Sequence, residues 1–282
     1  MKKKNLKEKF IEKINEEGFL AALKKSISWS FLKLKKNIGI HDPFEKRKIF
    51  LSNKLFEEFN GVVRYGLFKG LKLTSESSWG AADRASMLLG LYEHEILKSI
   101  EKIPDKYNTL IDFGAADGYY GIGVLVSGKF KKSYCYEMNP ISQKIIKKNA
   151  KLNDVYNNVL IRGLANKNFY KDFTHDELDN AVLLVDIEGA EFDLFDKDLF
   201  EKLSKSIIFI ELHPWIFKKD GYEELKKLEK DAAQYFKIEK ITTTGRDLSE
   251  FPELKKWGDT DRWLICSEGR PKLMTWLRLD PL

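Results

Sequence analysis

Acidic side chains end four of the predicted strands of this chain: Asp112, Glu137, Asp186 and Glu211. Each follows an apolar run, which is typical of the buried strands of a parallel sheet. Ligands of open α/β sheets bind outside the carboxyl ends of the strands, so we expect all four carboxylates at one edge. Carboxylates that lie close together repel one another unless they face a cationic or donor-rich group. The alternative for any one of them is a helix cap.

The segment Thr109–Gly121, TLIDFGAADGYYG, is the most informative part of the sequence. It predicts a strand, a turn of small residues and a helix, and the start of such a helix offers free N–H groups to a ligand. The dinucleotide fingerprint G-x-G-x-x-G is broken here, since Ala116 and Tyr119 stand at two of the three glycine positions. Asp112, Gly114 and Gly118 instead form the D-x-G-x-x-x-G pattern of S-adenosylmethionine (SAM) sites. A glycine turn without a ligand is the alternative.

The elements that must position these residues alternate along the chain. After the strand at 109–113, apolar runs predict strands over residues 133–137, 158–162, 181–186, 206–211, 237–243 and 262–266, and helices over 142–149 and 221–236. Upstream, helical spacing covers residues 1–40, an irregular β-containing segment covers 44–75, and Met87–Ile100 forms a helical core face capped by Asp83. Strands that alternate with helices predict a mainly parallel sheet with both faces covered.

Composition narrows the classes of function. Residues 1–48 carry 14 Lys or Arg and six Asp or Glu, so most of the net charge of +6 lies there and the remaining chain has a net charge of −2. A body of that charge argues against nucleic acid as a partner. The two cysteines favour a reducing compartment, and no apolar run is long enough to cross a membrane. The basic amino-terminal segment either lies on an anionic membrane or packs on the body with solvated lysines.

The order of these motifs resembles the FkbM family of SAM-dependent O-methyltransferases. The resemblance rests on D-F-G-A-A-D-G-Y-Y-G from Asp112, Y-E-M-N-P from Tyr136, V-D-I-E-G-A-E from Val185 and I-E-L-H-P from Ile210. It implies an α/β fold: a Rossmann-like, seven-stranded class I methyltransferase sheet, mostly parallel with an antiparallel last strand, plus a helical N-terminal extension. We divide the chain into a basic helical extension (1–45), a cap or substrate-side segment with a lead-in helix (46–105), the SAM-binding domain (106–270) and a tail (271–282).

The resemblance also assigns roles to individual residues. One set would bind SAM, with Glu137 on the ribose hydroxyls and Tyr92 and Glu93 at the methionine end. The full set is Asp112, Phe113, Gly114, Ala115, Asp117, Gly118, Glu137, Met138, Gly163, Leu164, Asp186, Tyr92 and Glu93. The catalytic set is His213, Glu188 and Asp186, with either Glu188 or His213 as the general base. Asp186 and Glu211 would hold Mg²⁺ if the reaction uses a metal.

The expected activity is therefore O-methylation of a sugar hydroxyl on a surface glycan, a lipid-linked or a nucleotide-linked sugar, as in polysaccharide biosynthesis. A small polyketide-type acceptor and a dinucleotide-dependent oxidoreductase are the alternatives. The expected location is cytoplasmic, with peripheral contact at the inner membrane face through the basic segment. Aromatic, Arg and Asp residues after Trp257 suit either a sugar ring or the interface of a homo-oligomer.

Overall fold

The computed structural model describes residues 43–217, 221–270 and 272–282. The chain divides into two compact units, residues 1–46 and 47–282. The described part of the first unit is residues 43–46, in the first turn of helix α3. The helices expected over residues 1–40, and the membrane contact expected of them, lie outside the described residues. No helix of the described ranges is long and apolar enough to span a membrane.

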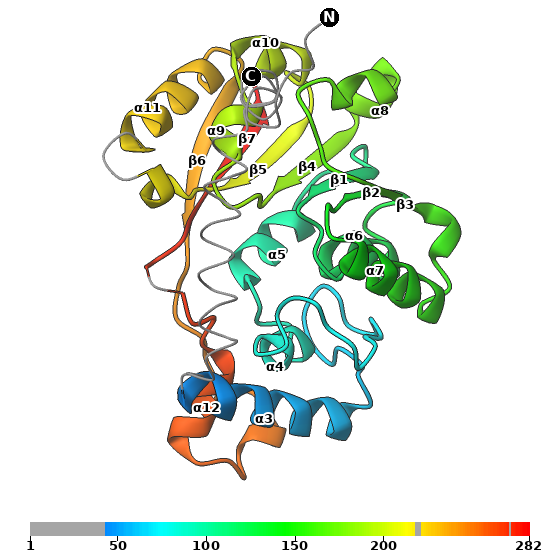
Figure 1. Ribbon diagram of the computed structural model, residues 1–282, viewed down its shortest axis with the longest axis vertical. Coiled ribbons are helices and arrows are strands. Elements are labelled where there is room, and N and C mark those ends of the chain that lie inside the picture. Colours follow the sequence, from blue (N-terminus) through cyan, green and yellow to red (C-terminus); the bar gives the residue numbers. More distant parts are fainter. Residues whose placement is uncertain (1–42, 218–220, 271) are drawn as a thin grey trace, which may run out of the picture. The chain divides into compact units, whose positions relative to one another are not determined.

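A single seven-stranded sheet forms the framework of the second unit (Figure 1). Its strand order is β3-β2-β1-β4-β5-β7-β6, in which β1–β5 are parallel and β7 runs antiparallel to both of its neighbours. The strands are β1 (Thr109–Phe113), β2 (Lys132–Tyr136), β3 (Val159–Arg162), β4 (Ala181–Val185), β5 (Ile207–Glu211), β6 (Phe236–Thr242) and β7 (Thr275–Pro281). This topology confirms the predicted fold class.

Helices cover both faces of this sheet, as continuous apolar strands require. Helices α5, α6 and α7 lie on one face and α8–α11 on the other (Figure 1). Successive strand residues alternate between the two cores: Leu110 belongs to the α5–α7 side and Ile111 to the opposite side. The helices are α5 (His94–Glu101), α6 (Tyr119–Val126), α7 (Pro140–Leu152), α8 (His175–Asp179), α9 (Glu191–Leu194), α10 (Lys197–Lys202) and α11 (Gly221–Ala232).

A third apolar cluster joins α3 (Pro43–Phe59), α4 (Arg84–Leu88) and α12 (Asp259–Cys266). The prediction that residues 44–75 are irregular is wrong at its start, because Leu51, Leu55 and Phe59 recur every four residues and bury one face of α3. The remainder of that segment contains one isolated bridge, between Val62 and Lys72.

Two further expectations about elements need correction. The helix expected over Met87–Ile100 is interrupted, because Gly90 and Glu93 take left-handed φ values of 67° and 45° between α4 and α5. Asp83 stands at the N-cap of α4, but its carboxylate pairs with Lys48 at 2.5 Å instead of capping the helix. The strand expected over 262–266 is helix α12, and the last strand is β7.

Candidate active site

The register of the sheet aligns three of the four acids at its carboxyl edge. Asp112 pairs with Cys135 of β2 and with Leu184 of β4, and Leu184 pairs with Phe209 of β5. Two residues further along, the same register brings Glu137, Asp186 and Glu211 into one row, and Gly114 takes the β1 position between Glu137 and Asp186. Asp112 lies two residues behind this row, inside the sheet.

Gly114 is where the chain comes closest to its neighbour. A Cβ built on this residue would lie 1.9 Å from the backbone oxygen of Asp186, and its φ is +86°. The amide of Gly114 donates to the carbonyl of Tyr136 at 2.9 Å. Gly118, also at φ +86°, precedes α6 and abuts Ile122 and Ile146. Gly114 therefore lets the β1–α6 turn pack against the end of β4, and Gly118 lets the start of α6 pack against α7.

Glu137 and the open residues after β2 and β3 form one side of the site. Glu137 is half-buried and accepts from the backbone N–H of Ala116 at 2.9 Å and of Asn139 at 2.7 Å, which leaves free lone pairs on both oxygens. Burial raises its pKa, although those N–H donors oppose the shift. Met138 and Leu164, at the ends of β2 and β3, are 64% and 73% exposed. Gly163 is open, because a Cβ added there would meet no atom within 4 Å.

Asp112 offers a second feature that fits a cationic ligand. It is buried, and its Oδ2 atom has no hydrogen-bond partner. Burial raises the pKa of this carboxyl to about 7, and the charge of Glu137 adds to the shift. Below the glycine turn, Asp112 is thus a buried carboxyl with one oxygen that the described residues leave without a hydrogen-bond partner.

Three residues expected to bind SAM have other surroundings. Phe113 stacks on Tyr136 in the core opposite α6, at a centroid distance of 5.0 Å. Asp117 is bound by the loop 77–79: Ser77 Oγ donates to it at 2.7 Å, and the Ser78 amide at 3.0 Å. Ala115 is buried in the α5–α7 core. Of Phe113 and Ala115, the backbone alone is left for a ligand.

The acids and the histidine of the predicted catalytic set do come together. The Nε2 atom of His213 lies 3.8 Å from Asp186 Oδ1, 3.7 Å from Glu188 Oε2 and 3.5 Å from Glu211 Oε2. His213 is buried, whereas the Glu188 side chain is 49% exposed. Glu188 stands in a left-handed turn at φ 54°, next to Gly189. One imidazole therefore lies within reach of three carboxylates, and one of these faces solvent.

Glu191 holds the other side of the same imidazole. Its Oε1 accepts from the backbone N–H of His213 at 2.9 Å and lies 3.3 Å from the ring Nδ1, while Oε2 accepts from the Gly189 amide at 2.7 Å. An acid on the first turn of a helix, where Glu191 stands, commonly complements the helix dipole. In the structure this fully buried carboxylate ties the Asp186–Glu191 turn to the loop after β5.

These contacts set the charges of the cluster. Burial lowers the pKa of His213, but hydrogen bonds to Glu191 and Glu211 outweigh it and raise the pKa to about 11. Burial also raises the pKa of Asp186, and the neighbouring charge of Glu211 raises it further. The pKa of Glu211 is lowered: burial opposes its charge, but the bond from His213 and the charge of Arg270 prevail. Near neutral pH the cluster therefore contains an imidazolium, and the pKa values of Asp186 and Glu211 are shifted in opposite directions.

Arg270 is a member of this site that sequence reasoning missed. Its guanidinium bonds to Glu211 and Glu93 and, at 2.8 Å through Nε, to Glu268. Glu93 also accepts from the hydroxyl of Tyr120 at 2.7 Å, and burial raises its pKa to about 8. Tyr92, its neighbour, packs edge-on against Tyr119 at 5.8 Å. No sequence signal linked Arg270 to β5, because 59 residues separate it from Glu211.

Comparison with known proteins gives one family match. The sequence model of the TRM5/TYW2 methyltransferase domain matches residues 87–215, which contain the glycine turn, the acids and His213. No curated protein matches the chain.

Solved structures with a similar arrangement were also found. They include a protein of the NADB-Rossmann superfamily from Streptococcus agalactiae (17% identity, 66% of this chain and 67% of that chain, TM-score 0.43). They also include the B. subtilis m1A22 tRNA methyltransferase TrmK (10%, 67% and 65%, 0.44). A third is the putative tRNA (m1A22) methyltransferase Sp1610 of Streptococcus pneumoniae in complex with SAM (14%, 65% and 72%, 0.41).

The family match, with a glycine turn and carboxyl edge that fit the donor, defines the class of this protein: it is a SAM-dependent methyltransferase. The resemblance to the FkbM family is wrong, because the matching family is TRM5/TYW2. The most specific element of the FkbM resemblance, D-I-E-G-A-E at Asp186–Glu191, is a strand end, a turn and a helix start. Such a short segment fixes local geometry, which unrelated families can share.

The expected partners are also corrected. The expectation of a sugar or glycan acceptor without nucleic acid conflicts with the match to the TRM5/TYW2 methyltransferase domain. Membrane contact and a homo-oligomer stay predictions. The argument from net charge against nucleic acid was wrong because it considered only residues 49–282. A net charge of −2 over residues 49–282 says nothing of the 14 Lys and Arg in residues 1–48.

Proposed function

We propose that this protein transfers the methyl group of SAM to RNA, with transfer RNA as the acceptor. The observation that carries the proposal is the match to the TRM5/TYW2 methyltransferase domain over the residues that build the site. The composition supports it, because the charge of +8 in residues 1–48 supplies the Lys and Arg that contacts to phosphates need. A cytoplasmic location belongs to the same proposal, and the free thiols of Cys135 and Cys266 agree with it.

The donor side of the site would hold SAM through three groups of this chain. Glu137 would accept the ribose hydroxyls, Met138 and Leu164 would flank the adenine, and Asp112 would face the methionine end. When bound, SAM supplies an electrophilic methyl group on a sulfonium. The residues of the chain must then orient the acceptor toward that methyl and remove one proton from the acceptor N–H or O–H.

Glu188 is the group best suited to take that proton. His213 already carries a proton at neutral pH, because Glu191 and Glu211 raise its pKa to about 11. Burial and the charge of Glu211 raise the pKa of Asp186, and its side chain is less exposed than that of Glu188. Glu188 is half exposed and thus open to an incoming acceptor. Its carboxylate lies 3.7 Å from Nε2 of the imidazolium, which can orient it. Of the two expected bases, we therefore favour Glu188 over His213.

A divalent ion such as Mg²⁺ is the second cofactor that the sequence analysis considered. Asp186, Glu211 and His213 offer ligand atoms that all lie within 4.8 Å of one another. Such an ion would acidify an acceptor hydroxyl when bound. It would have to displace Arg270 from Glu211 and the proton from His213, and these two cations already balance part of the negative charge. We therefore propose that proton removal by Glu188 proceeds without a metal.

The experiment is methyl transfer from labelled SAM to unmodified tRNA transcripts, followed by nucleoside mass spectrometry. We expect one methylated nucleoside from the wild-type protein and a strongly reduced yield from Glu188→Gln. RNA binding should weaken steeply with salt, as phosphate contacts require. Methylation of nucleotide sugars or glycans, with no methylation of tRNA under the same conditions, would overturn the proposed acceptor but not the assignment to SAM-dependent methyltransferases.

A further inference from the structure

Arg270 joins two parts of the site that come from distant segments. Glu93 immediately precedes α5, on the side where the methionine end of SAM is expected, and Glu211 ends β5 beside His213. The guanidinium of Arg270 contacts both carboxylates through its two terminal nitrogens. All three side chains are largely shielded from solvent, with Arg270 at 17% exposure. The buried carboxylates of Glu93 and Glu211 would repel one another without the guanidinium that both contact.

The segment that carries Arg270 is itself anchored to α5. Arg246 donates to Glu95 at 2.7 Å, to Glu268 at 2.6 Å and to the carbonyl of Leu91 at 3.0 Å. Glu268 accepts from the Glu93 amide at 3.0 Å and holds the Nε atom of Arg270. Fixed on one side by Glu268, the guanidinium presents its other edge to Glu93 and Glu211. This geometry matches the planar fork of arginine and would not suit a lysine.

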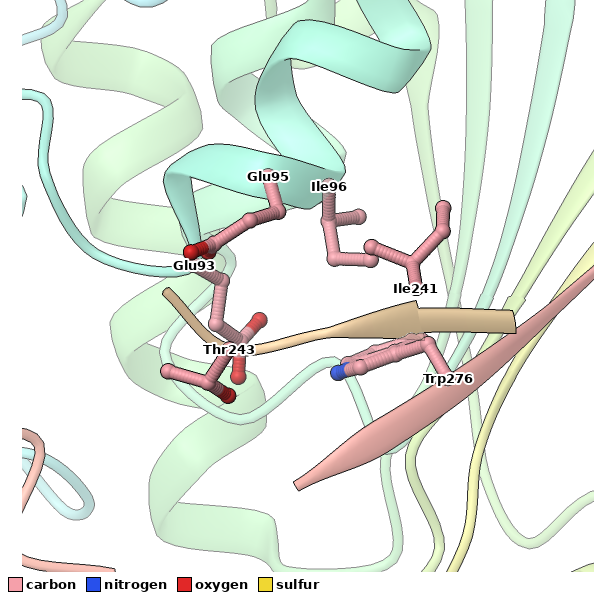
Figure 2. A pocket seen from close by; sticks show the side chains of 6 residues that line it. All are labelled: Glu93, Glu95, Ile96, Ile241, Thr243 and Trp276. Carbon is pink, nitrogen blue, oxygen red and sulfur yellow. The ribbon is translucent and has the colours of Figure 1, made fainter. Parts of the chain in front are cut away.

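A small cavity lies beside Glu93, between α5 and the end of the sheet. Figure 2 shows Glu93, Glu95 and Ile96 of the α5 region facing Ile241, Thr243 and Trp276 of the β6 and β7 region. The cavity between them measures about 10 Å³, which holds one water molecule at most. The spacing between α5 and the sheet therefore depends on the side chains themselves.

We propose that Arg270 is a positioning residue of the methyl-transfer site: it fixes the Glu93 carboxylate relative to the Glu211 carboxylate, and so aligns the donor side with the acid and histidine cluster. The residue lies outside the segment that matches the TRM5/TYW2 domain, residues 87–215. The proposal rests on the SAM site and not on the identity of the acceptor.

Binding of SAM and of S-adenosylhomocysteine by calorimetry tests this proposal without any acceptor. In Arg270→Gln we expect both ligands to bind at least about tenfold more weakly, and to a similar extent, because a displaced α5 affects the parts that they share. A purely electrostatic role of Arg270 predicts a different result for each ligand. Loss of a cation would favour the positively charged SAM and leave the uncharged thioether unaffected.

Two further variants make the test specific. Arg270→Lys should remain impaired, since an ammonium cannot bridge two carboxylates in a fixed fork, while millimolar guanidinium should restore part of the affinity of Arg270→Ala. Lys132→Gln is the control: Lys132 is the first residue of β2, at the opposite end of the strand from Glu137, and pairs with Glu177 of α8 at 3.0 Å. It should bind both ligands as the wild-type protein does.

The proposal is overturned if Arg270→Gln binds both ligands within about twofold of the wild-type protein, or binds SAM more tightly with no change for S-adenosylhomocysteine. If Arg270→Gln does not fold, the affinities of Arg270→Lys for SAM and S-adenosylhomocysteine are judged by the same criteria. Failure of tRNA methylation would leave these binding results valid, so the two proposals fail separately.

Discussion

The carboxylate of Glu191 holds both the backbone amide and the ring of His213, at 2.9 Å and 3.3 Å through the same Oε1 atom. This contact joins the turn after β4 to the loop after β5. It also fixes which ring nitrogen of His213 faces the protein and which faces Asp186, Glu188 and Glu211. A fully buried residue therefore sets the geometry of the cluster of acids around His213.

Substitution of Glu191 should show this dependence. In Glu191→Gln we expect kcat to fall by about 100-fold, because the imidazolium loses its charged partner and its fixed orientation. Asp193→Asn, on the same short helix but exposed, should leave kcat unchanged. Steady-state methylation and thermal unfolding of the two variants provide the measurement. Equal activity of Glu191→Gln and Asp193→Asn would contradict the assigned role.

The half-exposed Glu188 should separate chemistry from donor binding. In Glu188→Gln we expect kcat to fall by about 100-fold to 10,000-fold, the range for loss of a general base. SAM affinity should hardly change, since Glu137, Asp112 and the glycine turn form the donor side. Single-turnover rates and calorimetry with SAM measure the two effects. A loss of SAM affinity as large as the loss of rate would place Glu188 in the donor site instead.

The buried Asp112 makes stability depend on pH. Its pKa is raised to about 7 in the folded protein by burial and the charge of Glu137, whereas an unfolded aspartate titrates near 3.9. The folded state therefore binds this proton more strongly than the unfolded state does. The contribution of Asp112 to the free energy of unfolding is full below about pH 4 and is lost as the pH rises to about 7, by on the order of 4 kcal/mol.

Asp112→Asn stays neutral and should lack this loss. Urea unfolding of both proteins at about pH 5 and about pH 8 measures it, and the variant should gain relative stability at the higher pH. SAM binding should weaken at the same time, because the expected partner of its positive methionine end is gone. A stability difference between variant and wild type that is the same at both pH values would argue against this titration.

Gly114 should tolerate no side chain. In Gly114→Ala the new Cβ would lie 1.9 Å from the Asp186 carbonyl, at φ +86°, so the β1–α6 turn must move away from β4. We expect loss of SAM binding and destabilisation by about 3 kcal/mol or more. Gly245→Ala, whose Cβ would meet nothing within 4 Å, is the control. Comparable SAM affinity of the two variants would show that the close approach does not matter.

Chelation tests the metal alternative. Because Arg270 and His213 already neutralise part of the acid cluster, methyl transfer should proceed unchanged in EDTA, and added Mg²⁺ should not accelerate it. Initial rates with metal-stripped protein provide the measurement. A loss of rate in EDTA that Mg²⁺ restores would instead assign Asp186, Glu211 and His213 as ligands.

Local patterns predicted the parallel half of the fold well. The strands β1 to β5 are short apolar runs that end in acids or turns, and their boundaries lie within one residue of the prediction. The elements that were wrong depend on distant partners. Trp263, Ile265 and Cys266 have β propensity, but Ile265 and Cys266 pack against α3 and α4 as part of helix α12. Strand β7 requires β5 and β6 on its two sides, which no local pattern reveals.

The candidate site divides in the same way. The topology of a parallel sheet brings residues at or just after strand ends to one edge. These residues are Glu137, Asp186, Glu188, Glu211 and His213. The contacts of Asp117 with the loop 77–79 and of Arg270 with Glu93 join segments far apart in sequence. Spacing cannot predict such pairs, because they form when separate layers of the fold meet.

The position of β7 has a consequence for folding during synthesis. Residues 275–281 insert between β5 and β6, although they are made after both. Until they emerge from the ribosome, Glu211 lies on an open edge strand and β6 has no partner in the sheet. Closure of this half of the enzyme must therefore be a late step, and a chaperone that shields the β5 edge would act on the nascent chain in that interval.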